Sequence, residues 1–287
     1  MHGLAKAEAA YSRGDYPTAL RHFVPLANAG NIAAMVGLGE MYEDGRGVLQ
    51  DYAEAVKWYR EAAGQGDARA QYGLGRMYEN GWGVPQDDGE AVKWFRKAAD
   101  QGNGNAQYNL GVMHLSGRGV PQNDGEAVRW FRNAADQGDA TAQNNLGGLI
   151  QRGLGAPQDH AEAARWYRKA ADQGFPGAQY NLGIAYANGL GVAQDHSEAV
   201  KWFRKAAYQD FPGAQYNLGL IYGAGRGAPQ DLVQAHKWFN LAASHYPASD
   251  AEERDLATKH RDLIAARMTL AQVGEAEKLA GEWTRTK

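Results

Sequence analysis

Residues 103–138 read NGNAQYNLGVMHLSGRGVPQNDGEAVRWFRNAADQG, and variants of this 36-residue stretch follow one another along most of the chain. Each copy carries one tryptophan 36 residues after the previous one, at Trp58, Trp94, Trp130, Trp166, Trp202 and Trp238. A constant period of this length is typical of a stacked array of one structural unit, not of a globular domain with a single core. Such an array presents a long surface to other molecules.

Each copy contains two apolar patterns with helical spacing. In the copy over residues 67–102, Leu74, Met77 and Tyr78 follow a spacing of three and four, and a second run from Ala91 to Ala99 does the same. Neither predicted helix is longer than about 14 residues, so neither would be stable alone in water. Contacts between neighbouring helices must therefore supply the stability.

Glycine and aspartate mark the helix ends. A Gly-x-Gly pair separates the two helices, and its first glycine is expected to end the first helix in the left-handed conformation. The second helix opens with an Asp followed by Glu three residues on, as in Asp51 and Glu54, which is an N-cap pattern. A further glycine lies inside the first helix of every copy, where it costs up to about 1 kcal/mol relative to alanine and predicts close approach of a neighbouring helix.

The ends of the chain resemble repeats that have drifted. We expect residues 1–30 to form an N-terminal drifted repeat, residues 31–246 six 36-residue repeats, and residues 247–287 a C-terminal capping helix pair. Ser249 with Glu252, and Thr269 with Gln272, are the predicted caps of the last two helices. The sequence thus predicts an all-α chain of about 16 helices.

Composition argues against several functional classes. Thirty basic and 33 acidic residues give a net charge of −3, which is too balanced for nucleic-acid binding. No stretch approaches 18 apolar residues, so we expect no membrane span. The chain has no cysteine, no H-E-x-x-H motif and no evident nucleophile–base pair, so we expect no catalytic, cofactor-binding or metal-binding residues. His114 replaces a repeated tyrosine and is expected to be a packed core histidine.

The pattern A-x-x-x-L-G-x-x-Y…G-x-G-V-P-Q-D…E-A-V-K-W-F-R-K-A-A…G resembles the Sel-one-like repeat family, a relative of the tetratricopeptide repeat. The resemblance covers residues 31–246 in six copies. It implies a right-handed α-solenoid superhelix of antiparallel helix pairs. It also implies the function of an adaptor or scaffold, which is common among the family's many bacterial members.

The resemblance to tetratricopeptide repeats implies that the first helix of each pair lines a concave face. Aligning the Leu-Gly dipeptides gives these candidate partner-binding residues: Arg69, Tyr72, Arg76, Tyr108, Asn109, Asn145, Tyr180, Asn181, Tyr216 and Asn217. Asparagine can hydrogen-bond a ligand backbone, and tyrosine offers rigid apolar area with a polar tip. Arg76 is expected to offer a positive charge to a partner. The alternative is that Tyr-Asn-Leu-Gly is a consensus for packing the first helix.

Trp82 occupies a repeat position that holds arginine or leucine in the other copies. A tryptophan at a loop tip could anchor a partner. Alternatively, its ring lies over the end of the adjacent helix.

We therefore expect a monomeric, non-enzymatic scaffold that binds a protein or peptide segment. The alternatives are a cell-wall-associated enzyme or regulator, and a purely structural spacer. The N-terminal MHGLAKAEAA lacks the apolar core of a secretory signal. Because this sequence starts inside a helical pattern and the resemblance points to many exported proteins, both an exported protein whose leader precedes this sequence and a cytoplasmic protein stay open.

Overall fold

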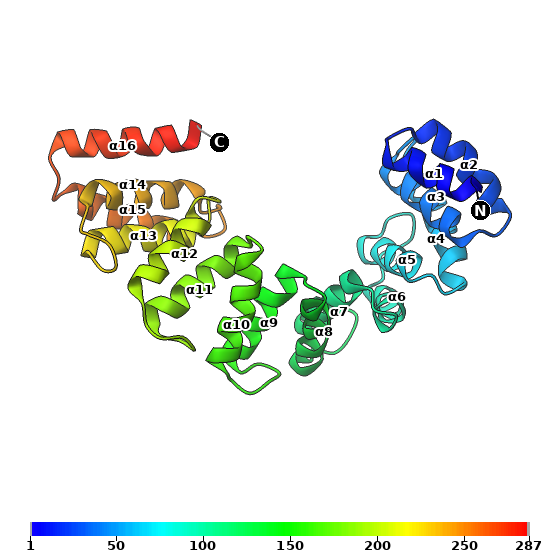
Figure 1. Ribbon diagram of the computed structural model, residues 1–287, viewed down its shortest axis with the longest axis horizontal. Coiled ribbons are helices and arrows are strands. Elements are labelled where there is room, and N and C mark those ends of the chain that lie inside the picture. The colour runs from blue at the N-terminus through cyan, green and yellow to red at the C-terminus, as the bar shows by residue number, and fades with distance from the viewer. Residues whose placement is uncertain (1, 286–287) are drawn as a thin grey trace. The chain divides into compact units, whose positions relative to one another are not determined.

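The computed structural model describes residues 2–285, which form 16 α-helices and no strand (Figure 1). The helices are α1 His2–Ser12, α2 Tyr16–Asn28, α3 Ile32–Asp44, α4 Tyr52–Gly64, α5 Ala68–Asn80, α6 Asp88–Asp100, α7 Gly104–Ser116, α8 Asp124–Asp136, α9 Ala140–Arg152, α10 His160–Asp172, α11 Pro176–Asn188, α12 His196–Ala207, α13 Pro212–Ala224, α14 Leu232–His245, α15 Ala251–Ala265 and α16 Leu270–Arg285. The predicted all-α class and helix number are confirmed. Within residues 2–285, no helix has the length and apolar character needed to cross a bilayer.

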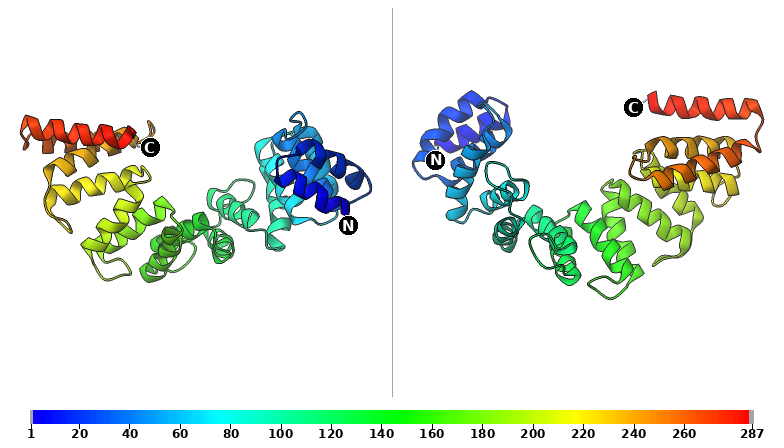
Figure 2. Two further views of the ribbon diagram at one scale, coloured as in Figure 1. Left: turned by 45° about the horizontal axis from the view of Figure 1, so that its top comes forward. Right: turned by 180° about the vertical axis from the view of Figure 1, so that it is seen from behind.

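The chain divides into two compact units, Met1–Gln137 with α1–α8 and Gly138–Lys287 with α9–α16. We call the odd-numbered helices A-helices and the even-numbered ones B-helices. From α1 to α8 and from α9 to α15, each A-helix packs against the B-helix that follows it within its unit, and that B-helix packs against the next A-helix. The arrangement is a solenoid of helix pairs. At the C-terminal end, α14 packs against both α15 and α16, with α16 shown in red in Figure 2.

The helix ends follow the repeated sequence signals. Asp51 Oδ1 accepts hydrogen bonds from the backbone N–H groups of Ala53 and Glu54, at 2.9 and 3.1 Å, and so caps α4. Gly45 ends α3 with a φ of 68°, in the left-handed region where glycine is favoured.

Of the two caps predicted at the C-terminal end, one is confirmed. Thr269 and Gln272 form a reciprocal capping box, with distances of 2.9 and 3.3 Å. The other is wrong, because α15 begins after Asp250, not Ser249, and Asp250 forms no side-chain capping bond.

A glycine inside each A-helix from α3 to α13 makes room for an aromatic ring from the paired B-helix. A Cβ atom added at Gly75 would lie 2.6 Å from Phe95, well inside van der Waals contact. The corresponding pairs are Gly39–Tyr59, Gly111–Phe131, Gly147–Tyr167, Gly183–Phe203 and Gly219–Phe239. The predicted close approach is confirmed, and the ring that fills the space belongs to the residue after the repeated tryptophan. This aromatic ring is buried in every copy and sets the distance at which the paired helices pack. It thereby fixes the spacing of the A-helices that carry the candidate site.

Candidate functional site

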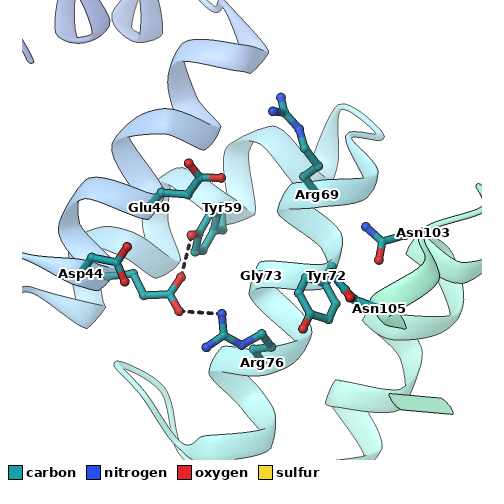
Figure 3. A pocket seen from close by; sticks show the side chains of 10 residues that line it. Glu40, Asp44, Tyr59, Arg69, Tyr72, Gly73, Arg76, Asn103 and Asn105 are labelled. Atoms are coloured by element: carbon teal, nitrogen blue, oxygen red, sulfur yellow. Dashed lines mark hydrogen bonds and ion pairs between the residues drawn. The ribbon is translucent and has the colours of Figure 1, made fainter. Parts of the chain in front are cut away.

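Three of the predicted partner-binding residues, Arg69, Tyr72 and Arg76, lie together on α5 beside a cavity of about 280 Å³ (Figure 3). Their spacing of three and four residues puts them on one side of the helix. The other lining residues come from α3, α4, α5 and the start of α7, and are Glu40, Glu43, Asp44, Tyr59, Gly73, Asn103 and Asn105. We call this the unit-1 cavity, because all of its walls belong to the first unit.

A buried carboxylate organises one side of the unit-1 cavity. The Glu43 side chain lies 3.0 Å from Arg76, measured from Oε1 to Nη1, and its Oε2 accepts a hydrogen bond of 2.7 Å from Tyr59 Oη. Both bonds are drawn as dashed lines in Figure 3. Glu43 is only 8 % exposed, and burial raises the pKa of Tyr59, so that tyrosine stays a hydrogen-bond donor. The positive charge expected on Arg76 is thus paired with Glu43, and a contact of Arg76 with a partner stays a prediction.

Glu40 and Arg69 also face the cavity, and they form fewer bonds than Glu43 and Arg76 do. Burial raises the pKa of Glu40, an effect that the nearby Arg69 partly offsets. The Arg69 side chain is well exposed, and its only ion pair within residues 2–285, with Asp67, is long at 3.8 Å. Three carboxylates and two guanidinium groups line the cavity altogether, so its walls carry more negative than positive charge. The carboxylates suit hydrogen-bond donors of a partner, and Arg69 suits an acceptor.

The other predicted residues of the first unit pack against their neighbours. The Tyr108 ring lies 5.7 Å from the Phe131 ring, and Asn109 is half-buried. Trp82 stacks on Tyr52, at the start of α4, with ring centroids 5.3 Å apart and planes 11° from parallel. The Trp82 ring thus lies over the end of a helix, as the packing alternative predicts. Its role as a loop anchor stays a prediction.

In the second unit, several candidate residues form hydrogen bonds with other residues of that unit. Asn181 donates to Asn144 Oδ1 at 3.0 Å, and Asn217 donates to the carbonyl of Gly213 at 2.9 Å. Tyr216 Oη lies 2.9 Å from His260 Nδ1 on α15. The others, Tyr180 and Asn145, are half-buried. That all ten candidates form one wall across both units stays a prediction.

Sequence reasoning missed Glu40, Glu43 and Tyr59, although a signal for the last two was present. Only two copies have tyrosine instead of phenylalanine after the repeated tryptophan, at Tyr59 and Tyr167. Tyr167 Oη donates to Gln151 Oε1 at 2.6 Å, and Gln151 occupies the register of Glu43. Where a B-helix has tyrosine after the repeated tryptophan, the residue 16 positions earlier on the A-helix is therefore a polar hydrogen-bond acceptor.

The described residues hold no group of three histidine, cysteine or acidic side chains that could bind a metal ion. Both oxygens of Glu43 are engaged by Arg76 and Tyr59, and Asp44 is paired with Arg46 at 3.3 Å, so these two carboxylates are committed to contacts within the protein. The arrangement is suited to recognition by hydrogen bonds and charge.

Comparison with known proteins identifies the repeat. The Sel1 repeat matches residues 32–67, 68–103, 104–139, 140–175, 176–211 and 212–246. A Sel1 repeat protein from Oxalobacter formigenes is 32 % identical, with 84 % of this chain and 96 % of that chain covered and a TM-score of 0.73. A protective antigen of uropathogenic Escherichia coli strains that displays an SLR fold is 26 % identical, with 99 % and 91 % covered and a TM-score of 0.65. No curated protein matches the chain.

The six matches run without a gap through residues 32–246, and they coincide with the helix pairs from α3/α4 to α13/α14. Sel1 repeat proteins generally act as scaffolds for protein interactions. The repeat sequence, the helix pairs and the similar structures lead to the same assignment: the chain belongs to the Sel1 repeat family.

Proposed function

We propose that this protein is a non-enzymatic scaffold that binds a protein or peptide segment on the A-helix face of its first unit. The observation that carries the proposal is the unit-1 cavity, in which charged and polar side chains from α3, α5 and α7 face one space. An A-helix face with such a cavity is the kind of concave, partly polar surface that ligands occupy in proteins.

The cavity is organised before a partner arrives. Glu43 holds both Arg76 and Tyr59, so these side chains lose little further freedom on binding. Around this fixed centre, Arg69 and Asn105 are exposed and available to a partner. The carboxylates can accept hydrogen bonds from backbone N–H groups of a bound segment, and Arg69 and Asn105 can donate hydrogen bonds to its carbonyl or carboxylate oxygens.

An enzyme that acts on cell-wall material is the competing function. The cavity does contain two glutamates, and burial raises the pKa of Glu40. A glutamate pair of this kind would need a second carboxylate free to accept a proton or attack a substrate. Glu43 is engaged at both oxygens by Arg76 and Tyr59, which supports the scaffold over the enzyme.

A binding experiment with exposed variants tests the proposal. A partner is first isolated with the wild-type protein, and its affinity is then measured by calorimetry. Arg69→Ala and Asn105→Ala should each weaken binding by about 1 kcal/mol, because both side chains reach the cavity without supporting the fold. Asn133→Ala, on the exposed side of α8, is the matched control and should leave the affinity unchanged. An affinity that ignores both cavity variants would refute binding at this face.

A further inference from the structure

A second recessed surface lies in the other unit, on both sides of α13. One cavity, of about 640 Å³, is bordered by α11, α12 and α13, and the other, of about 360 Å³, by α13, α14 and α15. Leu220 and Ala224 line both, so the two cavities adjoin along α13. We call them together the α13 groove.

The space arises from the way in which α13 departs from the repeat. Where α5 has Arg76, Glu79 and Asn80, α13 has leucine, glycine and alanine at the same registers. Loss of the long polar side chains opens the groove and leaves apolar groups on its walls. Leu220 is 39 % exposed and Leu263, on α15, is 55 % exposed, so two large apolar side chains that line the groove are accessible to a partner.

The permanently charged side chains that line the α13 groove are arginines. Among the described residues no carboxylate lines either cavity, whereas Arg226 lines one and Arg267 the other. Neither arginine forms an ion pair with any residue in the described part of the chain. Leu263 also borders a neighbouring recess lined by Asp255 and Asp262, and Asp262 is paired with Arg261 at 2.8 Å. The groove itself combines apolar side chains with two arginines, and polar side chains line the larger cavity, namely Asn188, Gln194, His196 and Asn217.

We propose that the α13 groove binds an extended protein segment in which bulky apolar side chains alternate with carboxylates. The inference rests on the proposed scaffold function and names the partner chemistry of a second site. Apolar side chains would enter the two cavities beside Leu220, where their removal from water stabilises the complex. The carboxylates would meet Arg226 and Arg267, whose guanidinium groups can bind a carboxylate through two parallel hydrogen bonds. A basic segment would be repelled by the same two arginines.

The test uses the full chain and four short capped peptides, with alternating glutamate and leucine, glutamine and leucine, lysine and leucine, or glutamate and serine. Binding is followed by NMR through the methyl signals of leucine and isoleucine. The glutamate–leucine peptide should bind at least about fivefold more tightly than the other three, and it should shift the signals of Leu220, Ile221 and Leu263. Equal affinity for the lysine–leucine peptide, or shifts confined to other methyl groups, would contradict the proposal.

Charge reversal gives an independent check with a matched control. Arg226→Glu and Arg267→Glu should each weaken the glutamate–leucine complex about fivefold and strengthen the lysine–leucine complex. Arg165→Glu changes the net charge by the same amount on the exposed side of α10 and should change neither affinity. If all three variants behave alike, only the net charge matters and the groove assignment fails.

The two proposals fail in distinguishable ways. A partner that depends on Arg69 and Asn105, together with no binding of the glutamate–leucine peptide, would support the unit-1 cavity and refute the α13 groove. Peptide binding at Leu220, together with a partner that ignores Arg69 and Asn105, would support the groove and refute the cavity.

Discussion

Gln101 Nε2 donates a hydrogen bond of 2.7 Å to the side-chain oxygen of Gln71, which is buried on the preceding A-helix. Gln71 in turn donates to the carbonyl of Ala63 on the B-helix before it, at 3.3 Å. One buried amide therefore links three consecutive helices. The same link recurs as Gln137–Gln107, Gln173–Gln143 and Gln209–Gln179, and His245 replaces the donor to Gln215.

The glutamine links should contribute measurably to stability. Gln107→Leu removes the acceptor of Gln137 and leaves the carbonyl of Ala99 without its side-chain partner. Each of the two lost hydrogen bonds contributes about 0.5–1.5 kcal/mol, so we expect a loss of about 1–3 kcal/mol in urea unfolding. Asn133→Ala, at an exposed site, should change the free energy of unfolding by less than about 0.5 kcal/mol. Equal stability of the two variants would refute the structural role of the link.

Two glycine substitutions should have opposite effects. Gly75→Ala places a methyl group 2.6 Å from Phe95, and overpacking of this kind costs about 1–3 kcal/mol. Gly64→Ala meets no atom within 4 Å, so it should stabilise the helix by up to about 1 kcal/mol. Thermal melts followed by circular dichroism compare the two. A Gly75→Ala variant that melts at or above the wild-type temperature would show that α5 and α6 are less closely packed.

His114 should make stability depend on pH. The side chain is 6 % exposed, and burial, followed by the charge of Arg96, lowers its pKa below the usual value. The folded state therefore prefers the neutral imidazole, and the stability contribution is lost as pH falls from about 6.5 through the lowered pKa. His114→Tyr restores the repeated tyrosine, which could bond Arg96 as Tyr186 bonds Arg168. We expect a smaller stability loss between pH 7.5 and 5.5 in the variant, measured by urea unfolding. An unchanged pH dependence would remove His114 as its source.

The two kinds of tryptophan should differ in their stability effects. Trp130 is 2 % exposed, and Trp130→Ala should cost about 3–5 kcal/mol. Trp82 is half-buried and stacked on Tyr52, so Trp82→Ala should cost about 1–2 kcal/mol. Denaturant melts with the reverse order would contradict the burial of these rings. Weaker partner binding by Trp82→Ala, beyond its effect on folding, would support a role as an anchor.

Features that recur in every copy could be predicted from the sequence. The Gly-x-Gly pair, the Asp caps and the glycine of each A-helix signal the same local structure six times, so helix number and ends followed from them. The unit-1 cavity depends instead on where the copies differ. Glu43 and Tyr59 are 16 residues apart and meet only because α3 and α4 pair. The Arg76–Glu43 bond joins two neighbouring repeats, a contact for which single-copy patterns give no signal.

The candidate residues also differ in the contacts that they form in the structure. Arg69, Tyr72 and Arg76, chosen by aligning the Leu-Gly dipeptides, lie together at the unit-1 cavity, and their contact with a partner stays a prediction. Tyr216 was chosen by the same register, yet its hydroxyl meets His260 of α15, a helix outside the regular repeats. Contacts made by the capping helices carry no periodic signal.

Site-specific photocrosslinking tests most directly the claim that this protein binds a partner through an A-helix face. A photoreactive amino acid is placed at Asn105 on α7, or at Asn133 on α8, and each variant is irradiated in cells of the source organism. Both positions are exposed in the same unit, so they differ mainly in the face that they report. We predict a discrete crosslinked protein at position 105 that is absent at 133 and disappears when Arg69→Ala is added. A product at position 133 with none at 105 would contradict the claim.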